Sequence, residues 1–154
     1  NYGNLCQRII SFIKTNCNSI IPEKKNITSL ELDLIKNDNI DILRDLMENQ
    51  EMNKYIKIVI DMSFNTNKYI NDTEPWKLKK TDVDRMNTVL NVSVNQIRKI
   101  SILLNPIIPQ ATEKVLNILK VPAENRNLES LNKQKPFDLD TEIGDLEILF
   151  KKFS

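Results

Sequence analysis

The chain has 154 residues, of which 40% are hydrophobic and 28% are charged, and its 22 Lys and Arg residues nearly balance its 21 Asp and Glu residues. These values fit one globular domain with a sizeable core and exclude fibrous and disordered proteins. The chain contains only two glycines, which excludes the glycine-rich loops that bind phosphate groups. A formal charge of +1 argues against a wholly basic nucleic-acid surface but leaves room for a local basic patch.

The sequence contains no histidine, so the commonest general base and the commonest zinc ligand are both missing. Cys6 and Cys17 are the only thiols, and two thiols alone make a poor metal site. We therefore expect no metal site and no catalytic residue. Reduced thiols, and the lack of a long apolar run or a signal-like start, favour a cytoplasmic protein without a membrane contact.

Hydrophobic residues recur at helical spacing along most of the chain, which predicts an all-α helical bundle. Few glycines and prolines also argue against an all-β domain. The helix pattern begins at the first residues without an initiator Met, so we expect a piece of a longer protein. The predicted helices cover the start of the chain to about residue 16, then residues 29–35, 40–49, 51–70, 81–105 and 110–120.

Four local features are predicted from the residues between and after these helices. Residues 71–80 contain Glu74-Pro75-Trp76, which predicts a break between two long helices. Thr81 is the expected N-cap of the following helix. Asp82 and Arg85, three residues apart, are expected either to pair or to help anchor the loop that carries Trp76. Residues 121–154 are less regular and predict a strap across the bundle.

The long helix at residues 51–70 is expected to be central, with its apolar stripe facing the core. Three apolar residues lie off this stripe and predict that other elements cover the helix on more than one side. They are Ile58, Ile60 and Met62.

Asn4 and Arg8 lie four residues apart and project from one face of the first predicted helix. An amide and a guanidinium offer the hydrogen-bonding groups that can read the edge of an unstacked RNA base. The same pair also suits an ordinary solvated helix face. The residues alone leave both interpretations open.

Trp76 is the only tryptophan, and Lys77, Lys79 and Lys80 follow it. An exposed aromatic ring beside positive charge suits single-stranded RNA, because the ring can stack on a base while the ammonium groups contact phosphates. A ring that anchors an interhelix connection in the core would look the same in sequence. Both interpretations remain open on the residues alone.

Several segments together resemble the anticodon-binding domain of methionyl-tRNA synthetase, a class I aminoacyl-tRNA synthetase. The resemblance covers essentially the whole chain, as a single domain at residues 1–154. The matching segments are residues 2–5 (Tyr-Gly-Asn-Leu) with Arg8 and Phe12, residues 67–70 (Asn-Lys-Tyr-Ile), residues 74–80 (Glu-Pro-Trp-Lys-Leu-Lys-Lys), and residues 103–109 (Leu-Leu-Asn-Pro-Ile-Ile-Pro) with Leu119.

This resemblance implies a helical bundle that binds the anticodon loop of tRNA. The family's roles, carried over, make Trp76 the platform for the first anticodon base, Pro75 the residue that shapes its turn, and Asn4 and Arg8 the base readers. The lysines after Trp76 are expected to contact the RNA backbone on their charge alone. The implied partners are the initiator and elongator methionine tRNAs and the catalytic domain of the parent chain.

The parent enzyme of this family uses ATP, with Mg²⁺, to attach methionine to its tRNA, and this domain would select the CAU anticodon. Neither the HIGH nor the KMSKS signature occurs here, so we expect no catalysis and no cofactor in this chain. The family's frequent ending Leu-Phe-Pro-Arg-Ile is replaced by Leu-Phe-Lys-Lys-Phe at residues 149–153. The alternatives are the corresponding domain of a leucyl-, valyl- or cysteinyl-tRNA synthetase, and a helical protein-interaction module.

Overall fold

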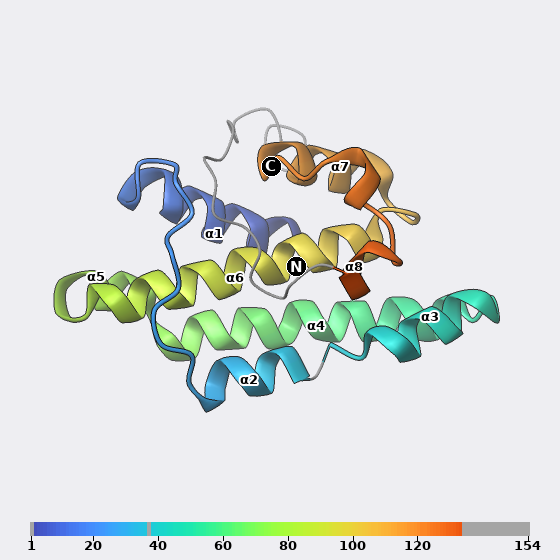
Figure 1. The fold of residues 1–154 in the computed structure, drawn as a ribbon, viewed down its shortest axis with the longest axis horizontal. Helices are drawn as coiled ribbons and strands as arrows, with labels where there is room; N and C mark the ends of the chain where they lie inside the picture. The colour runs from blue at the N-terminus through green and yellow to red at the C-terminus, as the bar shows by residue number, and fades with distance from the viewer. Residues whose placement is uncertain (1, 37, 134–154) are drawn as a thin grey trace.

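The computed structural model describes residues 2–36 and 38–133, and every regular element among them is helical (Figure 1). This confirms the predicted all-α fold. The elements are α1 (Tyr2–Asn16), α2 (Ser29–Lys36), α3 (Ile40–Glu48), α4 (Met52–Thr73), α5 (Pro75–Thr81), α6 (Val83–Leu104), α7 (Pro109–Ile118), the 3-10 turn η1 (Ala123–Asn125) and α8 (Ser130–Lys133).

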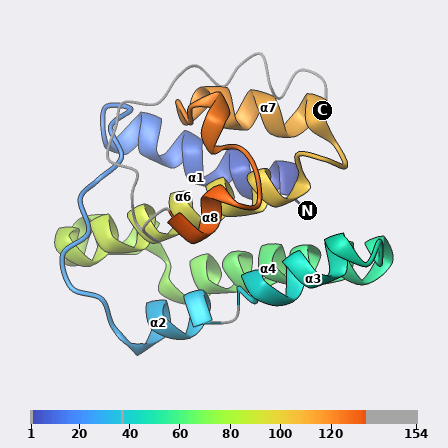
Figure 2. The ribbon, with the colours of Figure 1, turned by 45° about the vertical axis from the view of Figure 1, so that its right-hand side comes forward.

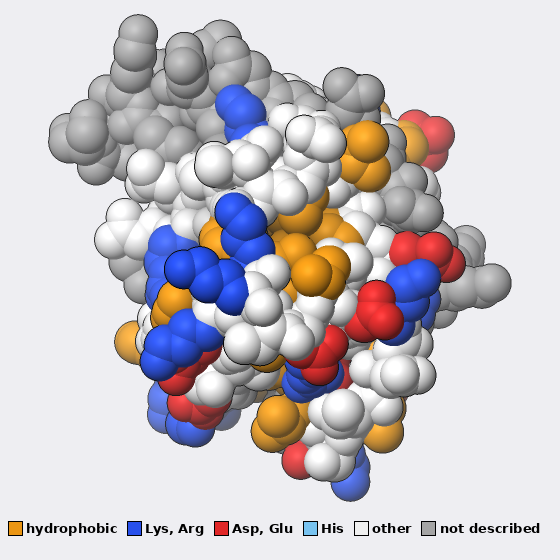
Figure 3. Space-filling view, turned by 90° about the vertical axis from the view of Figure 1, so that its left-hand side faces the viewer, with side chains coloured by type: hydrophobic (Ala, Val, Ile, Leu, Met, Phe, Trp, Pro, Cys, Tyr) orange, Lys and Arg blue, Asp and Glu red, His pale blue; other side chains and the backbone are white. Residues whose placement is uncertain are grey.

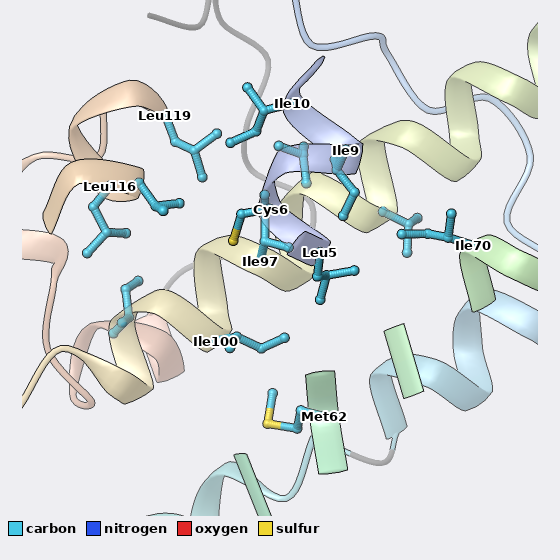
Figure 4. Packing of buried hydrophobic residues seen from close by; sticks show 14 of the residues in the cluster. Leu5, Cys6, Ile9, Ile10, Met62, Ile70, Ile97, Ile100, Leu116 and Leu119 are labelled. Carbon is cyan, nitrogen blue, oxygen red and sulfur yellow. The ribbon is translucent and has the colours of Figure 1, made fainter. Parts of the chain in front are cut away.

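Helix α6 lies at the centre of the bundle and packs against α1, α4, α5 and α7 (Figures 1 and 2). Helices α2 and α3 cover α4 from the side away from α7. Figure 4 shows the core between α1, α6 and α7, where Cys6 and Ile10 of α1 lie close to Ile97 of α6 and to Leu116 and Leu119. Such close packing of apolar side chains is the main source of the bundle's stability.

Helices α1 and α4 run in the same direction, and α6 runs opposite to both. Tyr2, at the start of α1, contacts the hydroxyl of Ser101, and Tyr55, near the start of α4, donates a hydrogen bond to the carbonyl of Leu103 at 2.6 Å. Later residues of α1 and α4 meet α6 near Leu90, in its first half. The two helices therefore lie side by side against α6 with the same polarity.

Helix α6 is buried almost all round from Thr88 to Leu104, although its sequence contains many polar residues. Several of its polar groups make hydrogen bonds across the bundle, as most buried polar groups do. Lys99 Nζ lies 2.6 Å from a carboxylate oxygen of Asp38, and Gln96 Nε2 donates to the other carboxylate oxygen at 3.0 Å. Burial lowers the pKa of Lys99, although the carboxylate of Asp38 partly opposes that shift. The link between α2 and α3 is thereby fixed to the central helix.

A second buried ion pair joins α2 to α6. The guanidinium of Arg85 binds both carboxylate oxygens of Glu31, at 2.6 and 2.7 Å. Burial alone raises the pKa of Glu31, but hydrogen bonds from Arg85, Thr28 and Tyr69 outweigh it and hold that pKa at about 2. The expected pairing of the Asp82 and Arg85 side chains is therefore wrong: Glu31 takes the guanidinium, and Asp82 accepts only the Arg85 backbone N–H, at 3.1 Å.

The predicted break at residues 71–80 is confirmed only at Glu74, because α4 continues to Thr73 and α5 starts at Pro75. Glu74 alone makes the turn, in the left-handed conformation with φ 50° and ψ 64°. Proline suits the first turn of a helix, so Pro75 starts a new turn, as predicted, and that turn continues as α5. The N-cap of α6 is Asp82 and not Thr81, since the Asp82 carboxylate accepts a hydrogen bond from the backbone N–H of Arg85 at 3.1 Å.

The prediction that other elements cover α4 on several sides is correct only in part. Met62 is buried and Ile58 is half-buried, but Ile60 is 46% exposed. The predicted strap covers residues 121–154, and its described part consists of η1 and α8. Residues 134–154, with Pro136, Gly144 and the terminal Leu-Phe-Lys-Lys-Phe, lie outside the described residues.

Candidate nucleic-acid interface

Arg8 is held in place by two asparagines of α4. Its Nη1 atom donates to Asn67 Oδ1 at 2.7 Å, and its Nη2 atom donates to Asn71 Oδ1 at 2.9 Å. The two amides are one helical turn apart, which matches the fork of a guanidinium. Both partners are neutral amides, so they fix the position of Arg8 without offsetting its charge.

Trp76 lies directly beside this guanidinium. The Cζ atom of Arg8 is 5.8 Å from the centroid of the Trp76 ring, within the range of a cation–π contact. The ring is nevertheless 43% exposed. It combines a fixed position with an open surface, as a stacking platform for a base requires.

The position of Trp76 follows from the turn before it. Glu74 closes α4 with a 3.0 Å hydrogen bond from its N–H to the carbonyl of Ile70 and turns the chain in its left-handed conformation. Pro75 follows as a buried residue in the first turn of α5. Trp76 is therefore the second residue of a helix, and its backbone is held next to the turn that faces Arg8. The prediction that Trp76 lies in a helix break is wrong, but Pro75 does shape the turn that presents it.

An apolar hollow borders Trp76 and Arg8 at the junction of α1, α4, α5 and α6. Among its lining residues, the buried hydroxyl of Ser93 has no hydrogen-bond partner in the described part of the chain. The lining residues are Arg8, Ile9, Phe12, Ile70, Pro75, Trp76, Leu90 and Ser93.

Asn4 is exposed and lies one turn before Arg8 on the same face of α1. The structure thus brings Arg8, Pro75 and Trp76 into contact around one hollow and places Asn4 next to that group along α1. The arrangement offers an aromatic face, a guanidinium and an amide on one continuous surface. These are the groups that recognise unpaired bases.

Lys77, Lys79 and Lys80 are all exposed on α5. Lys77 Nζ lies 2.6 Å from a carboxylate oxygen of Glu74, so part of its charge is compensated locally. Figure 3 views the end of the molecule that carries α5 and shows Lys and Arg side chains beside exposed hydrophobic surface. Positive charge therefore accompanies the apolar surface at this end of the bundle.

Sequence reasoning missed the role of Asn67 and Asn71. Asn67 appeared only as part of the resembling segment, and Asn71 was assigned to the predicted break. Their spacing of four residues on the exposed side of a helix is a usable signal, since it places two amides on one face. The contact with Arg8 could not be read from it, because 59 and 63 residues separate the partners.

The described residues contain neither a metal-binding cluster nor a helix that could span a membrane. No group of three or more Cys, Asp or Glu side chains among residues 2–36 and 38–133 is placed to hold a metal ion. Within the same residues, no helix has both the length and the apolar character needed to cross a bilayer.

Two solved structures have the same all-helical fold. The apo form of Mycobacterium tuberculosis methionyl-tRNA synthetase superposes with a TM-score of 0.85 and 22% identity over 93% of this chain and 30% of that chain. The same enzyme in complex with methionyl-adenylate gives a TM-score of 0.86 and 23% identity over 94% of this chain and 29% of that chain. The fold is therefore that of a helical-bundle domain found in an aminoacyl-tRNA synthetase.

The sequence comparisons define the family more closely. The family model for the anticodon binding domain of methionyl tRNA ligase matches residues 21–154. The methionine–tRNA ligase of Brucella suis is 34% identical over 80% of this chain and 24% of its own length, and that of Rickettsia prowazekii is 33% identical over 99% of this chain and 31% of its own length. The chain belongs to the family of methionyl-tRNA ligase anticodon-binding domains.

This assignment confirms the resemblance and favours the methionyl over the leucyl, valyl and cysteinyl alternatives. The chain spans about a quarter to a third of the length of the curated relatives it matches.

Proposed function

We propose that this domain recognises the CAU anticodon of the methionine tRNAs, both initiator and elongator. The observation that carries the proposal is the Arg8 guanidinium, fixed by Asn67 and Asn71 against a Trp76 ring that stays 43% exposed. The family assignment supports the same function. An interaction surface for a protein would not require a guanidinium held by neutral amides beside an open aromatic face.

Each residue of the site has a distinct role in this proposal. Trp76 stacks on the first anticodon base, and Pro75 fixes the turn that presents the ring. Asn4 and Arg8 read base edges, with an amide that both donates and accepts and a guanidinium that only donates. Cytosine and adenine edges offer acceptors to such groups, while the exposed Trp76 face accepts any base without regard to sequence.

Lys77, Lys79 and Lys80 contact the RNA backbone in this proposal. Their exposure on α5, next to Trp76, supports that role. Each ammonium that neutralises a phosphate releases counterions, so binding weakens as salt rises. Lys77 contributes least, since Glu74 already compensates part of its charge.

We further propose that the domain serves a longer methionine–tRNA ligase of the cytoplasm, whose catalytic domain is its second partner. The ligase would attach methionine to tRNA with ATP and Mg²⁺, while this domain holds no catalytic residue and takes no cofactor. The methionine–tRNA ligases that it matches support this proposal.

The first test is direct binding of an RNA stem-loop with a CAU anticodon, compared with a GAU stem-loop. Trp76 is the only tryptophan, so quenching of protein fluorescence reports stacking on its ring. A 5′-labelled stem-loop gives the affinity of Trp76→Ala by fluorescence anisotropy. We expect Trp76→Ala to weaken CAU binding by about 1–3 kcal/mol, or about 5- to 150-fold.

Ile42→Ala is the matched control, because Ile42 is a similarly exposed hydrophobic residue on α3, outside the site. It should bind like the unaltered chain. Equal affinity for CAU and GAU, together with no effect of Trp76→Ala, would refute the proposal and favour a protein-interaction module. Measurements at two salt concentrations separate the lysine contribution, which weakens with salt, from stacking.

A further inference from the structure

An exposed apolar surface on α4 continues directly from the asparagines that hold Arg8. Phe64 is 63% exposed and Ile60 is 46% exposed. At 3.6 residues per turn, positions 60, 64, 67 and 71 share one face of a helix. Phe64 therefore lies one turn before Asn67, on the same face that meets Arg8.

Two polar residues of α1, Arg8 and Asn4, follow the same direction as Asn67 and Phe64 of α4. Because α1 and α4 run in the same direction, the step from Arg8 back to Asn4 runs alongside the step from Asn67 back to Phe64. At 1.5 Å per residue, the two steps advance about 6 Å along α1 and about 4.5 Å along α4. Phe64 thus extends the surface of Trp76, Arg8 and Asn4 on the side of Asn4.

The surroundings of Phe64 favour RNA over a protein partner. Its neighbours one turn away on α4 are Ile60 and Asp61 before it and Asn67 and Lys68 after it, and Lys68 pairs with Asp72 at 2.7 Å. Exposed Lys57 lies two turns earlier on the same face. The exposed π-face of Phe64 can stack on a base while Asn67 and Lys57 contact polar atoms of RNA. A protein interface would instead bury a larger, continuous apolar area with less charge at its centre.

We propose that Phe64 is a second stacking platform, which takes the middle base of the anticodon while Trp76 takes the first, and that Lys57 contacts a phosphate beyond it. The proposal rests on the function proposed above, since it extends the same RNA surface. The separation from Phe64 to Lys57 is about 10 Å along the helix at 1.5 Å per residue, which an extended nucleotide and a lysine side chain can span.

The test uses a CAU stem-loop in which 2-aminopurine replaces the middle adenine. Stacking on Phe64 changes the emission of this base when RNA binds, and the Trp76 signal reports the first base independently. Phe64→Ala should weaken binding by about 5- to 150-fold and abolish the 2-aminopurine change, while the quenching of Trp76 at saturating RNA persists. Phe64→Tyr keeps the ring and should retain both signals.

Lys57→Gln should reduce the salt dependence of binding by about one phosphate contact. Lys54→Gln is its matched control, because Lys54 lies one turn farther from Phe64 than Lys57 does and pairs with Glu51 at 3.0 Å. An unchanged salt dependence for Lys57→Gln would overturn the phosphate contact. Thermal unfolding of every variant by circular dichroism confirms that the fold persists.

The outcomes distinguish this inference from the function on which it rests. If Trp76→Ala weakens CAU binding but Phe64→Ala leaves both affinity and 2-aminopurine emission unchanged, the second platform is wrong and anticodon recognition stands. A loss of affinity with an unaltered 2-aminopurine signal would also overturn stacking on Phe64. If no variant alters binding, both proposals fail.

Discussion

The sharpest prediction concerns Asn67 and Asn71, which fix Arg8 without themselves being assigned to RNA. Replacing both with alanine removes two hydrogen bonds, of 2.7 and 2.9 Å, from the Arg8 guanidinium. Both bonds are at an exposed site, so the fold should hardly change. The side chain of Arg8 becomes free to sample other rotamers before RNA binds.

The size of the effect follows from what binding must then restore. Ordering a free arginine side chain costs up to about 2 kcal/mol of conformational entropy. Each of the two hydrogen bonds stabilises the fixed position of Arg8 by about 0.5–1.5 kcal/mol before RNA binds. We expect the Asn67→Ala/Asn71→Ala protein to bind a CAU stem-loop about 1–2 kcal/mol more weakly, or about 5- to 30-fold. Each single substitution should cause roughly half of that free-energy loss, because the two bonds share one guanidinium.

Stem-loop titrations in a double-mutant cycle give the decisive measurement. In a protein that already carries Arg8→Ala, the further change Asn67→Ala should have no effect on affinity, because there is no guanidinium left to position. A loss of equal size in both backgrounds would refute the reasoning and place Asn67 on the RNA itself. Asn65→Ala is the control, since Asn65 is an exposed amide on another face of α4.

Two further predictions address charge. Folding lowers the pKa of the Glu31 carboxyl group from 4.5 to about 2, so the folded chain binds a proton at Glu31 less readily than the unfolded chain does. The ionised carboxylate therefore stabilises the fold fully above pH 4.5, and this stabilisation is lost as the pH falls toward 2. Glu31→Gln leaves Arg85 without its carboxylate and should lower the free energy of unfolding by roughly 3 kcal/mol at pH 7, with a weaker dependence of that free energy on pH between 7 and 3. Urea unfolding across this pH range measures both quantities, and parallel curves of unfolding free energy against pH for the variant and the unaltered chain would contradict the prediction. Asn71→Asp should neutralise Arg8 and weaken CAU binding several-fold more than Asn65→Asp does, as stem-loop titration at low salt would show.

Local periodicity predicted the helices well because their apolar residues repeat every three or four positions. The predicted helix 40–49 is observed as α3, Ile40–Glu48, and 110–120 as α7, Pro109–Ile118. The predicted break at residues 71–80 was too long, because only Glu74 is non-helical there and the new turn expected at Pro75 continues as α5. The turn depends on one residue, Glu74, in a left-handed conformation that a glutamate rarely adopts.

Contacts between residues far apart in the chain could not be predicted from the sequence. Lys99 and Gln96 have no local feature that marks them as buried, because their partner Asp38 lies about sixty residues earlier in the chain. For the candidate site, the resemblance supplied Trp76 and Arg8 as an aromatic and a cationic group. It could not supply the contact between them, which depends on how α1 and α5 pack against α6.

The two ways in which this chain partners its cations differ, and the difference bears on function. In the interior, Arg85 pairs with Glu31, where an uncompensated charge would be costly. At the candidate interface, Arg8 is held by the neutral amides of Asn67 and Asn71. A carboxylate there would hold the guanidinium more strongly but would offset the charge that attracts RNA. The amides of Asn67 and Asn71 therefore hold Arg8 less strongly and leave its charge available to RNA, as the proposed function requires and a purely structural contact does not.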